Sequence, residues 1–228
     1  MSTFVRCFAG FMLFVTFPAV ANSLPDISRN RFSTSQPMTT RLASVSVTLT
    51  HVSGATMPVR AVLEKALDSA NDRNVDLVTY TTTEAYPSGT QFKMAVQADE
   101  PTYLYVINSD DLNRTTRLFP ARNANGSLAV AAQSVINVPG DDRLFTLSQQ
   151  PGNAYVLILT ADKALDIDAF VTKLRAAPGD FKKKVYAVLG GDLVAPTNIR
   201  YDPARAASAI VGTPKGSIVP LLVTIAHR

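Results

Sequence analysis

The stretch from Phe92 to Pro120, FKMAVQADEPTYLYVINSDDLNRTTRLFP, carries the densest strand pattern in the chain. Alternate residues of 92–97 are apolar, which is typical of a strand with one buried face. The run YLYVI at 103–107 is rich in aromatic and β-branched residues, as in a strand that is buried on both sides. A polar turn, NSDD, separates this run from an extended segment at 115–119. We therefore expect an antiparallel hairpin here.

Further strands are predicted on either side of this stretch, and turns rich in Pro, Gly, Asn and Asp separate them. We expect them at 43–50, 75–83, 128–138, 144–149 and 154–160. Up to Thr160 the chain would thus contain about seven strands at intervals of roughly 8–12 residues. This spacing favours a β-sandwich.

Two helices are predicted to flank this core. Residues 58–71 begin with Pro58, which suits a first helical turn. Their apolar residues recur at intervals of three and four residues, as on one face of a helix. The second helix begins at Asp166 or Asp168, either of which can act as N-cap, and runs to about Ala176. We therefore predict a mainly β (α+β) protein, with a β-sandwich-like core and two flanking helices.

The C-terminal part of the chain has a weaker pattern. Strands are expected at 184–189 and 218–225, and Pro220 suggests that the latter lies at a sheet edge. Residues 198–209 have no clear pattern and are consistent with a loop.

The N-terminus has the features of a secretory signal peptide. Arg6 precedes an apolar run at 7–17, and Ala19-Val20-Ala21 is a cleavage site of small residues. The apolar run is about half the ~20 residues that a membrane span needs, so a transmembrane anchor is the weaker alternative. We predict a signal peptide at 1–21, cleavage after Ala21, and a periplasmic or secreted protein without a transmembrane anchor. The mature chain would have a flexible leader at 22–40 and a single β-rich domain at 41–228, with its core at 75–165 and a helix-strand extension at 166–228.

Composition excludes several kinds of site. The single cysteine, Cys7, lies in the predicted signal peptide, too early to be a lipid-modified cysteine at the cleavage point. The mature chain would therefore have no disulfide, no zinc-thiolate site and no cysteine nucleophile. It would carry 21 Lys and Arg against 18 Asp and Glu. The only basic run, Lys182-Lys183-Lys184, has no interleaved aromatics and fits a solvated turn or helix end, or weak attraction to anionic lipid or glycan. A nucleic-acid partner is not expected.

No catalytic or metal constellation stands out. The two histidines, His51 and His227, are far apart, and the mature chain has no cysteine to join them, so no metal and no cofactor are expected. His51 could supply a base, but the chain has no Gly-x-Ser-x-Gly elbow, and a strand-end role explains it. Acidic pairs stand at three predicted turns, and such pairs could serve a glycosidase or bind calcium. These pairs are Asp99-Glu100, Asp110-Asp111 and Asp141-Asp142. Because aspartate at a turn has a local explanation, we do not predict an enzyme.

Tyrosines offer a binding interpretation. Tyr103 and Tyr105 share one face of a regular strand, where they could stack on sugars or anchor a peptide. Alternatively, they fill the core of the sandwich with their hydroxyl groups at its edge. The candidate binding residues are Tyr103, Tyr105, Asp110 and Asp111.

A series of short motifs follows in a fixed order through the middle of the chain. They are Pro87-Ser88-Gly89, Phe92-x-Met94-x-Val96, Tyr103-Leu104-Tyr105-Val106, Leu118-Phe119-Pro120, Val138-Pro139 and Pro151-Gly152 followed by the apolar strand 155–159. By this order and spacing, the chain from about Glu84 to Leu165 resembles a bacterial family, the domain of unknown function numbered 4384. The family usually has Gly and Asn where Thr102 and Ala121 stand. The resemblance implies a small β-rich domain outside the cytoplasm that occurs beside kinases, caspase-like peptidases and envelope or secretion components. It implies no catalytic activity and no functional residues.

The expected function is therefore a non-catalytic binding or assembly module of the cell envelope. Its expected partner is an envelope or secretion-system protein, recognised by a sheet face or edge. The alternative is an enzyme that acts on carbohydrate or peptidoglycan, or a carbohydrate-binding module, using turn carboxylates and strand tyrosines.

Overall fold

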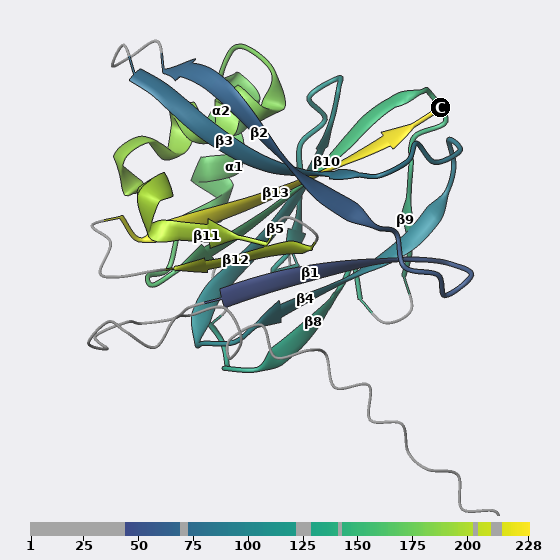
Figure 1. Ribbon diagram of the computed structural model, residues 1–228, viewed down its shortest axis with the longest axis horizontal. Coiled ribbons are helices and arrows are strands. Elements are labelled where there is room, and N and C mark those ends of the chain that lie inside the picture. Colours follow the sequence, from purple (N-terminus) through teal and green to yellow (C-terminus); the bar gives the residue numbers. More distant parts are fainter. Residues whose placement is uncertain (1–43, 69–72, 122–128, 141–142, 203–204, 211–215) are drawn as a thin grey trace, which may run out of the picture. The chain divides into compact units, whose positions relative to one another are not determined.

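The fold is built on two β-sheets, called sheet A and sheet B below, as seen in a computed structural model (Figure 1). The structure describes residues 44–68, 73–121, 129–140, 143–202, 205–210 and 216–228. The predicted signal peptide, the predicted leader and the pair Asp141-Asp142 lie outside these residues. No helix in the described part of the chain is long and apolar enough to cross a membrane.

Sheet A has six strands, and all its neighbours pair antiparallel. Their order is β11 (Ile199–Tyr201), β12 (Ala206–Ile210), β1 (Ser44–His51), β4 (Gln91–Ala98) and β8 (Ser134–Val138), and β9 (Phe145–Thr146) also pairs with β4. β1 and β4 pair over seven residues, from Val45 opposite Ala98 to His51 opposite Phe92. The strands predicted at 43–50 and 92–97 are thereby confirmed.

Sheet B has seven strands, and only β3 and β13 pair in parallel. Their order is β2 (Val59–Asp68), β3 (Arg73–Thr82), β13 (Ile218–His227), β10 (Gly152–Ala161), β5 (Thr102–Asp110) and β6 (Thr116–Phe119), and β7 (Ala129–Val130) also pairs with β5. β5 and β6 form the predicted antiparallel hairpin.

The main core lies between the two sheets, and alternate residues of each strand supply it. Val45, Val47 and Leu49 of β1 point into this core, as do Leu104 and Val106 of β5. The final strand, β13, adds Leu221, Val223 and Ile225 to the same cluster. The core therefore extends beyond residues 75–165.

A second core lies on the other face of sheet B, under two helices, α1 (Ile167–Ala176) and α2 (Phe181–Leu189). The residues of β5 and β10 that do not face sheet A enter this cluster, among them Tyr105 and Leu157. Two short 3-10 turns, η1 (Gly190–Asp192) and η2 (Pro196–Asn198), follow α2. In Figure 1 the helices gather beside sheet B, away from β1, β4 and β8. These elements confirm the mainly β fold with two packed sheets and two helices.

The placement of the helices differs from the prediction. The helix predicted at 58–71 is wrong where the structure describes it, since β2 occupies Val59–Asp68; residues 69–71 lie outside the described part. The apolar residues of this segment fit a period of two as well as a helical period, and Val59 and Ala61 both pack against the inter-sheet core. The segment is a strand because it forms ten residue pairs with β3, from Val59–Thr82 to Asp68–Arg73. Long-range pairing thus overrides the local pattern.

The strand predicted at 184–189 is also wrong, because these residues belong to α2. The carboxylate of Asp180 caps this helix by accepting a 3.0 Å hydrogen bond from the N–H of Lys183. Burial alone would raise the pKa of Asp180, but hydrogen bonds and charge from Lys183 outweigh it and lower that pKa. The buried residues Phe181, Lys184, Val185 and Leu189 then recur at helical spacing. Both helices therefore follow β10, and no helix precedes the core among the residues that the structure describes. α1 begins after Asp166, as predicted.

The last strand is central rather than at an edge, which corrects the prediction based on Pro220. β13 lies between β3 and β10. It pairs with β3 only from Leu222 to Thr224, and an isolated bridge joins Ile218 to Leu193. Pro220 lies between these two contacts, where its missing N–H interrupts no ladder. Residues 198–209 contain β11 and most of β12 in addition to loop.

Candidate functional site

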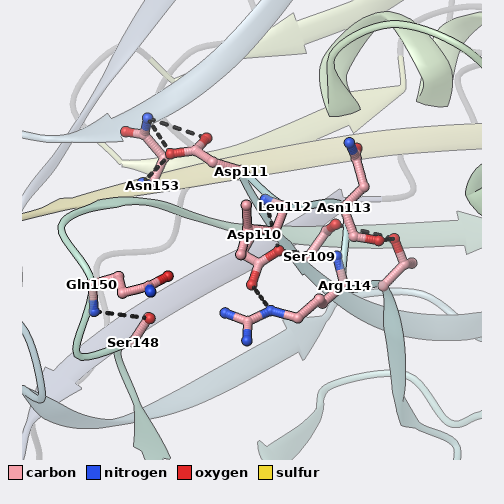
Figure 2. Close-up of polar contacts among 10 residues, drawn as sticks. Ser109, Asp110, Asp111, Leu112, Asn113, Arg114, Ser148, Gln150 and Asn153 are labelled. Atoms are coloured by element: carbon pink, nitrogen blue, oxygen red, sulfur yellow. Dashed lines mark hydrogen bonds and ion pairs between the residues drawn. The ribbon is translucent and has the colours of Figure 1, made fainter.

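Asp110, the first carboxylate predicted to bind a ligand, holds the turn between β5 and β6. Its Oδ1 accepts hydrogen bonds from the N–H groups of Leu112 (3.0 Å) and Arg114 (2.9 Å). Its Oδ2 forms an ion pair of 2.5 Å with Nε of Arg114 (Figure 2). Such bonds from Asp to nearby backbone define a turn. All the polar contacts of this carboxylate therefore serve its own hairpin.

Asp111 points away from this turn and ties the hairpin to the start of β10. Its Oδ2 accepts the backbone N–H of Asn153 at 2.7 Å, and its Oδ1 accepts the hydroxyl of Tyr155, also at 2.7 Å. The side chain of Asn153 donates to the same carboxylate at 3.2 Å. A Cβ atom on Gly152 would lie 2.7 Å from Oδ2, so any other residue at this position would displace the carboxylate from its present place.

The two carboxylates are thus engaged with different partners, Asp110 with Arg114 and Asp111 with Asn153 (Figure 2). A pair of carboxylates that act together on a glycosidic bond must face one substrate across a gap. In the described part of the chain, no group of three or more His, Cys, Asp or Glu residues could hold a metal ion. Each carboxylate therefore has a contact within the domain, Asp110 in the turn and Asp111 with β10.

The two predicted tyrosines do share one face of β5, but α1 and α2 cover that face. Tyr105 is fully buried, and its hydroxyl accepts the N–H of Leu165 at 2.8 Å. Tyr103 is half-buried against the same cluster. The structure therefore leaves no ring surface of Tyr105 for stacking on a sugar. The binding role of Tyr103, Asp110 and Asp111 stays a prediction.

The two histidines lie in separate local contacts. Nδ1 of His51 lies 2.7 Å from Oγ of Ser53 and accepts the backbone N–H of the same residue at 3.1 Å. This pair of bonds stabilises an exposed turn after β1. Nδ1 of His227, which is buried, lies 3.1 Å from Oγ of Ser88. Among the described residues, no carboxylate bonds to the ring of His51, so the orienting member of a triad is missing there.

The basic run Lys182-Lys183-Lys184 does not form a continuous charged patch. Lys183 is exposed, and its ammonium lies 3.4 Å from Asp180. Lys184 is buried in the face of α2 that packs on the protein. The three lysines lie at the start of α2, as the prediction of a helix end has it, but Lys184 is buried and not solvated.

Sequence reasoning missed a set of contacts that join the hairpin to α1. The side chain of Arg117 on β6 is only 4% exposed, and its NH1 forms a 3.1 Å ion pair with Asp168 in the first turn of α1. Its Nε is buried without a hydrogen-bond partner. Arg175 on the same helix donates to the carbonyl of Thr115. No local pattern identifies these pairs, because each joins residues more than fifty positions apart.

Two further tyrosines join sheet B to sheet A. The hydroxyl of Tyr80 on β3 lies 2.7 Å from the carbonyls of both Asp202 and Ala207. Its ring contacts that of Tyr201 on β11 at a centroid distance of 6.4 Å. Burial raises the pKa of Tyr80 above its ordinary value and raises that of Tyr201 to about 12. These rings are structural contacts between the layers.

β8, at one edge of sheet A, is the longest uncharged outer strand in the described part of the chain. β8 pairs with β4, and no described strand pairs with its other side. Val135 on this strand is 52% exposed. β8, with the sequence SVINV, contains no charged residue. In contrast, the outer strands β2 and β11 carry the exposed charges Arg60 and Arg200, and β6 carries Arg117. The outer strands β7 and β9 also lack charge but have only two residues each.

Charged residues on outer strands discourage pairing with other chains. β8 has no such protection, and its alternate residues direct N–H and C=O groups away from β4. It is therefore the candidate binding site of the described domain.

Comparison with known proteins gives one match, to the middle of the chain. No curated protein and no solved structure matches the sequence. Residues 85–164 match a family model described as "Domain of unknown function (DUF4384)", which confirms the predicted resemblance over the segment from the turn before β4 to the loop before α1.

Proposed function

We propose that this protein is a non-catalytic binding or assembly module of the bacterial cell envelope, active in the periplasm or after secretion. It recognises an envelope or secretion-system protein by pairing an extended segment of that partner with β8. The N-terminal features typical of a signal peptide support the location.

The uncharged outer strand β8 is the observation that carries this proposal. In β-strand addition, main-chain hydrogen bonds supply affinity, and alternate side chains supply specificity. On β8 the side chains on the solvent face are Val135 and Asn137, both exposed. They would contact alternate residues of the added strand. An uncharged, partly apolar segment of the partner fits this edge best, because it leaves no buried charge unpaired.

The polar contacts in the rest of the domain favour binding over catalysis. The carboxylates of Asp110 and Asp111 are occupied by backbone and side-chain donors of their own domain. The imidazole of His51 is likewise occupied by its own turn.

The test is capture from an envelope extract with matched variants of residues 22–228. Val135→Lys places a charge on the edge, and Val52→Lys places one on the exposed turn after β1. Val52 is 55% exposed, close to the 52% of Val135, so each change should alter the free energy of unfolding by at most about 0.5 kcal/mol. We expect a protein that binds the wild type and Val52→Lys but not Val135→Lys.

Capture that is equal for all three proteins would show that β8 is not the binding edge. Recovery of nothing above background by the wild type would count against the binding module itself. Hydrolysis of peptidoglycan by the purified wild type, lost on replacing Asp110 or Asp111, would establish the enzymatic alternative instead.

A further inference from the structure

The tip of the β5–β6 hairpin contains the tripeptide Asn113-Arg114-Thr115. The pattern Asn-x-Ser/Thr, with x other than proline, is the acceptor pattern for N-linked glycans, and it belongs on surface loops of exported proteins. No hydrogen bond among the described residues uses the amide side chain of this asparagine, which is exposed.

Asn113 is presented to solvent by the backbone of the turn. Its N–H donates to the carbonyl of Asp110 at 2.8 Å, and its carbonyl accepts the N–H of Thr115 at 2.9 Å. Its φ angle of 58° lies in the left-handed region, which asparagine adopts more readily than most residues. Figure 2 shows its side chain directed away from the carboxylates of Asp110 and Asp111. A large substituent on Nδ2 would therefore extend into solvent without displacing a described contact.

Thr115, the third residue of the pattern, has the opposite environment. It is 4% exposed, and its hydroxyl lies 3.0 Å from Oγ of Ser109 and 3.3 Å from the carbonyl of Asn113. An enzyme that recognises this hydroxyl cannot reach it in the closed hairpin. A glycan must therefore be attached to Asn113 before the β5–β6 hairpin closes, whereas the folded hairpin has room for the glycan once it is attached.

We propose that Asn113 is an acceptor for an N-linked glycan, which is attached to the exported chain before the β5–β6 hairpin closes. The proposal depends on export of the chain but not on binding at β8. The donor is an oligosaccharide on a lipid pyrophosphate. The amide nitrogen forms a bond to the anomeric carbon, the bond from that carbon to the phosphate oxygen breaks, and the lipid pyrophosphate leaves with the electron pair. The amide proton passes to a base of the transferase, and nothing is oxidised or reduced.

The test is to export the full mature chain in bacteria that contain an oligosaccharyltransferase and its lipid-linked donor. An efficient bacterial signal sequence replaces residues 1–21, so that the outcome does not depend on the native leader. Intact-mass and peptide mass spectrometry should show an added mass equal to that of the glycan, located on Asn113. A reporter protein with a known acceptor site in the same cells serves as the positive control.

Three variants distinguish the site from other asparagines. Asn113→Asp keeps a side chain that tolerates the left-handed backbone, and it should lose the added mass. Thr115→Val should also lose it, whereas Thr115→Ser should keep it. Purified, folded wild-type protein mixed with the same enzyme and donor should remain unmodified.

An unmodified wild-type chain beside a glycosylated reporter would overturn the proposal. So would added mass that persists in Asn113→Asp, or that is found only at the other pattern of this kind, Asn125-Gly126-Ser127. Modification of the folded protein at Asn113 would overturn the order of events.

Discussion

Sheet A and sheet B are made by the same chain but have different surroundings. The central strands β13, β10 and β5 of sheet B are covered on both faces, on one by sheet A and on the other by α1 and α2. Sheet A contributes one face to the core, and its other face carries exposed residues such as Thr48, Lys93 and Asn137. The strand sequences follow this difference, since LYVI in β5 is apolar throughout, whereas SVSVTLT in β1 alternates. Burial on two faces thus produces continuous apolar runs, and burial on one face produces alternation.

The comparison also indicates where change is tolerated. The central strands of sheet B form the middle layer, so a substitution on either of their faces disturbs a core. Within the described part of the chain, sheet A has one exposed face and an outer strand, β8, that pairs on one side only, and both can vary or bind without disturbing the core. The following predictions test this division, from the largest expected effect to the smallest.

Truncation of a central residue of sheet B should give the largest loss of stability. Leu157 on β10 is fully buried on the face that the helices cover. Leu157→Ala should lower the free energy of unfolding by about 2–5 kcal/mol, because it removes buried methyl groups and leaves a cavity. Thr48→Ala on the open face of sheet A is the control and should change it by at most about 0.5 kcal/mol. Urea unfolding measures the free energy of unfolding of both variants. If Leu157→Ala lost as little stability as Thr48→Ala, the helices would not bury this face of sheet B.

The tyrosines that join the two sheets should make the domain sensitive to alkali. The pKa of Tyr201 is raised by burial to about 12, and that of Tyr80 is raised as well. In the unfolded chain both ionise near pH 10. Burying the two neutral hydroxyl groups therefore makes the free energy of unfolding depend on pH. This contribution to stability is fully present below pH 10 and is lost as the pH rises toward 12, because the tyrosines of the unfolded chain lose their protons at a lower pH than those of the folded chain. Urea unfolding between pH 9 and about 12 should show this loss. In Tyr201→Phe, the free energy of unfolding should fall less steeply with pH over the same range. An unchanged slope in Tyr201→Phe would contradict the assignment to this residue.

Loss of the contact between the hairpin and β10 should have a smaller effect. Asp111→Ala removes the acceptor for the N–H of Asn153 and the hydroxyl of Tyr155. The site is exposed, so water can replace the carboxylate in part, and we expect a loss of about 1 kcal/mol. Hydrogen exchange should rise at the first residues of β10 but not in β1 or β4. Exchange that rises equally in both sheets would show that this contact supports more than sheet B.

Much of the middle of the fold could be predicted from sequence because its signals are local. β4, β5 and β6 are separated by Pro and Asp turns, and Asp166 caps α1. The parts that were mispredicted depend on distant partners. β2 is a strand because β3 pairs along its whole length, and β13 tolerates Pro220 because its contact with β3 begins only at Leu222.

The candidate site was harder to predict than the fold. The turn position of Asp110 and Asp111 could be predicted, but their hydrogen-bond partners could not, since Asn153 and Tyr155 lie more than forty residues away. The exposure of β8 follows from strand order, which depends on how the whole chain pairs. No window of sequence around Val135 contains that information.

The central position of β13 has a consequence for the order of assembly. Residues 218–227 fill the gap between β3 and β10, so sheet B stays in two parts until β13 is in place. During synthesis from the N-terminus, the hairpin of β2 and β3 and the pairing of β5 with β10 can form early, but the sheet that joins them cannot be completed before residue 227 is available. For the same reason, a fragment cut at 85–164 would lack the strand beside β10 and should not hold its shape alone.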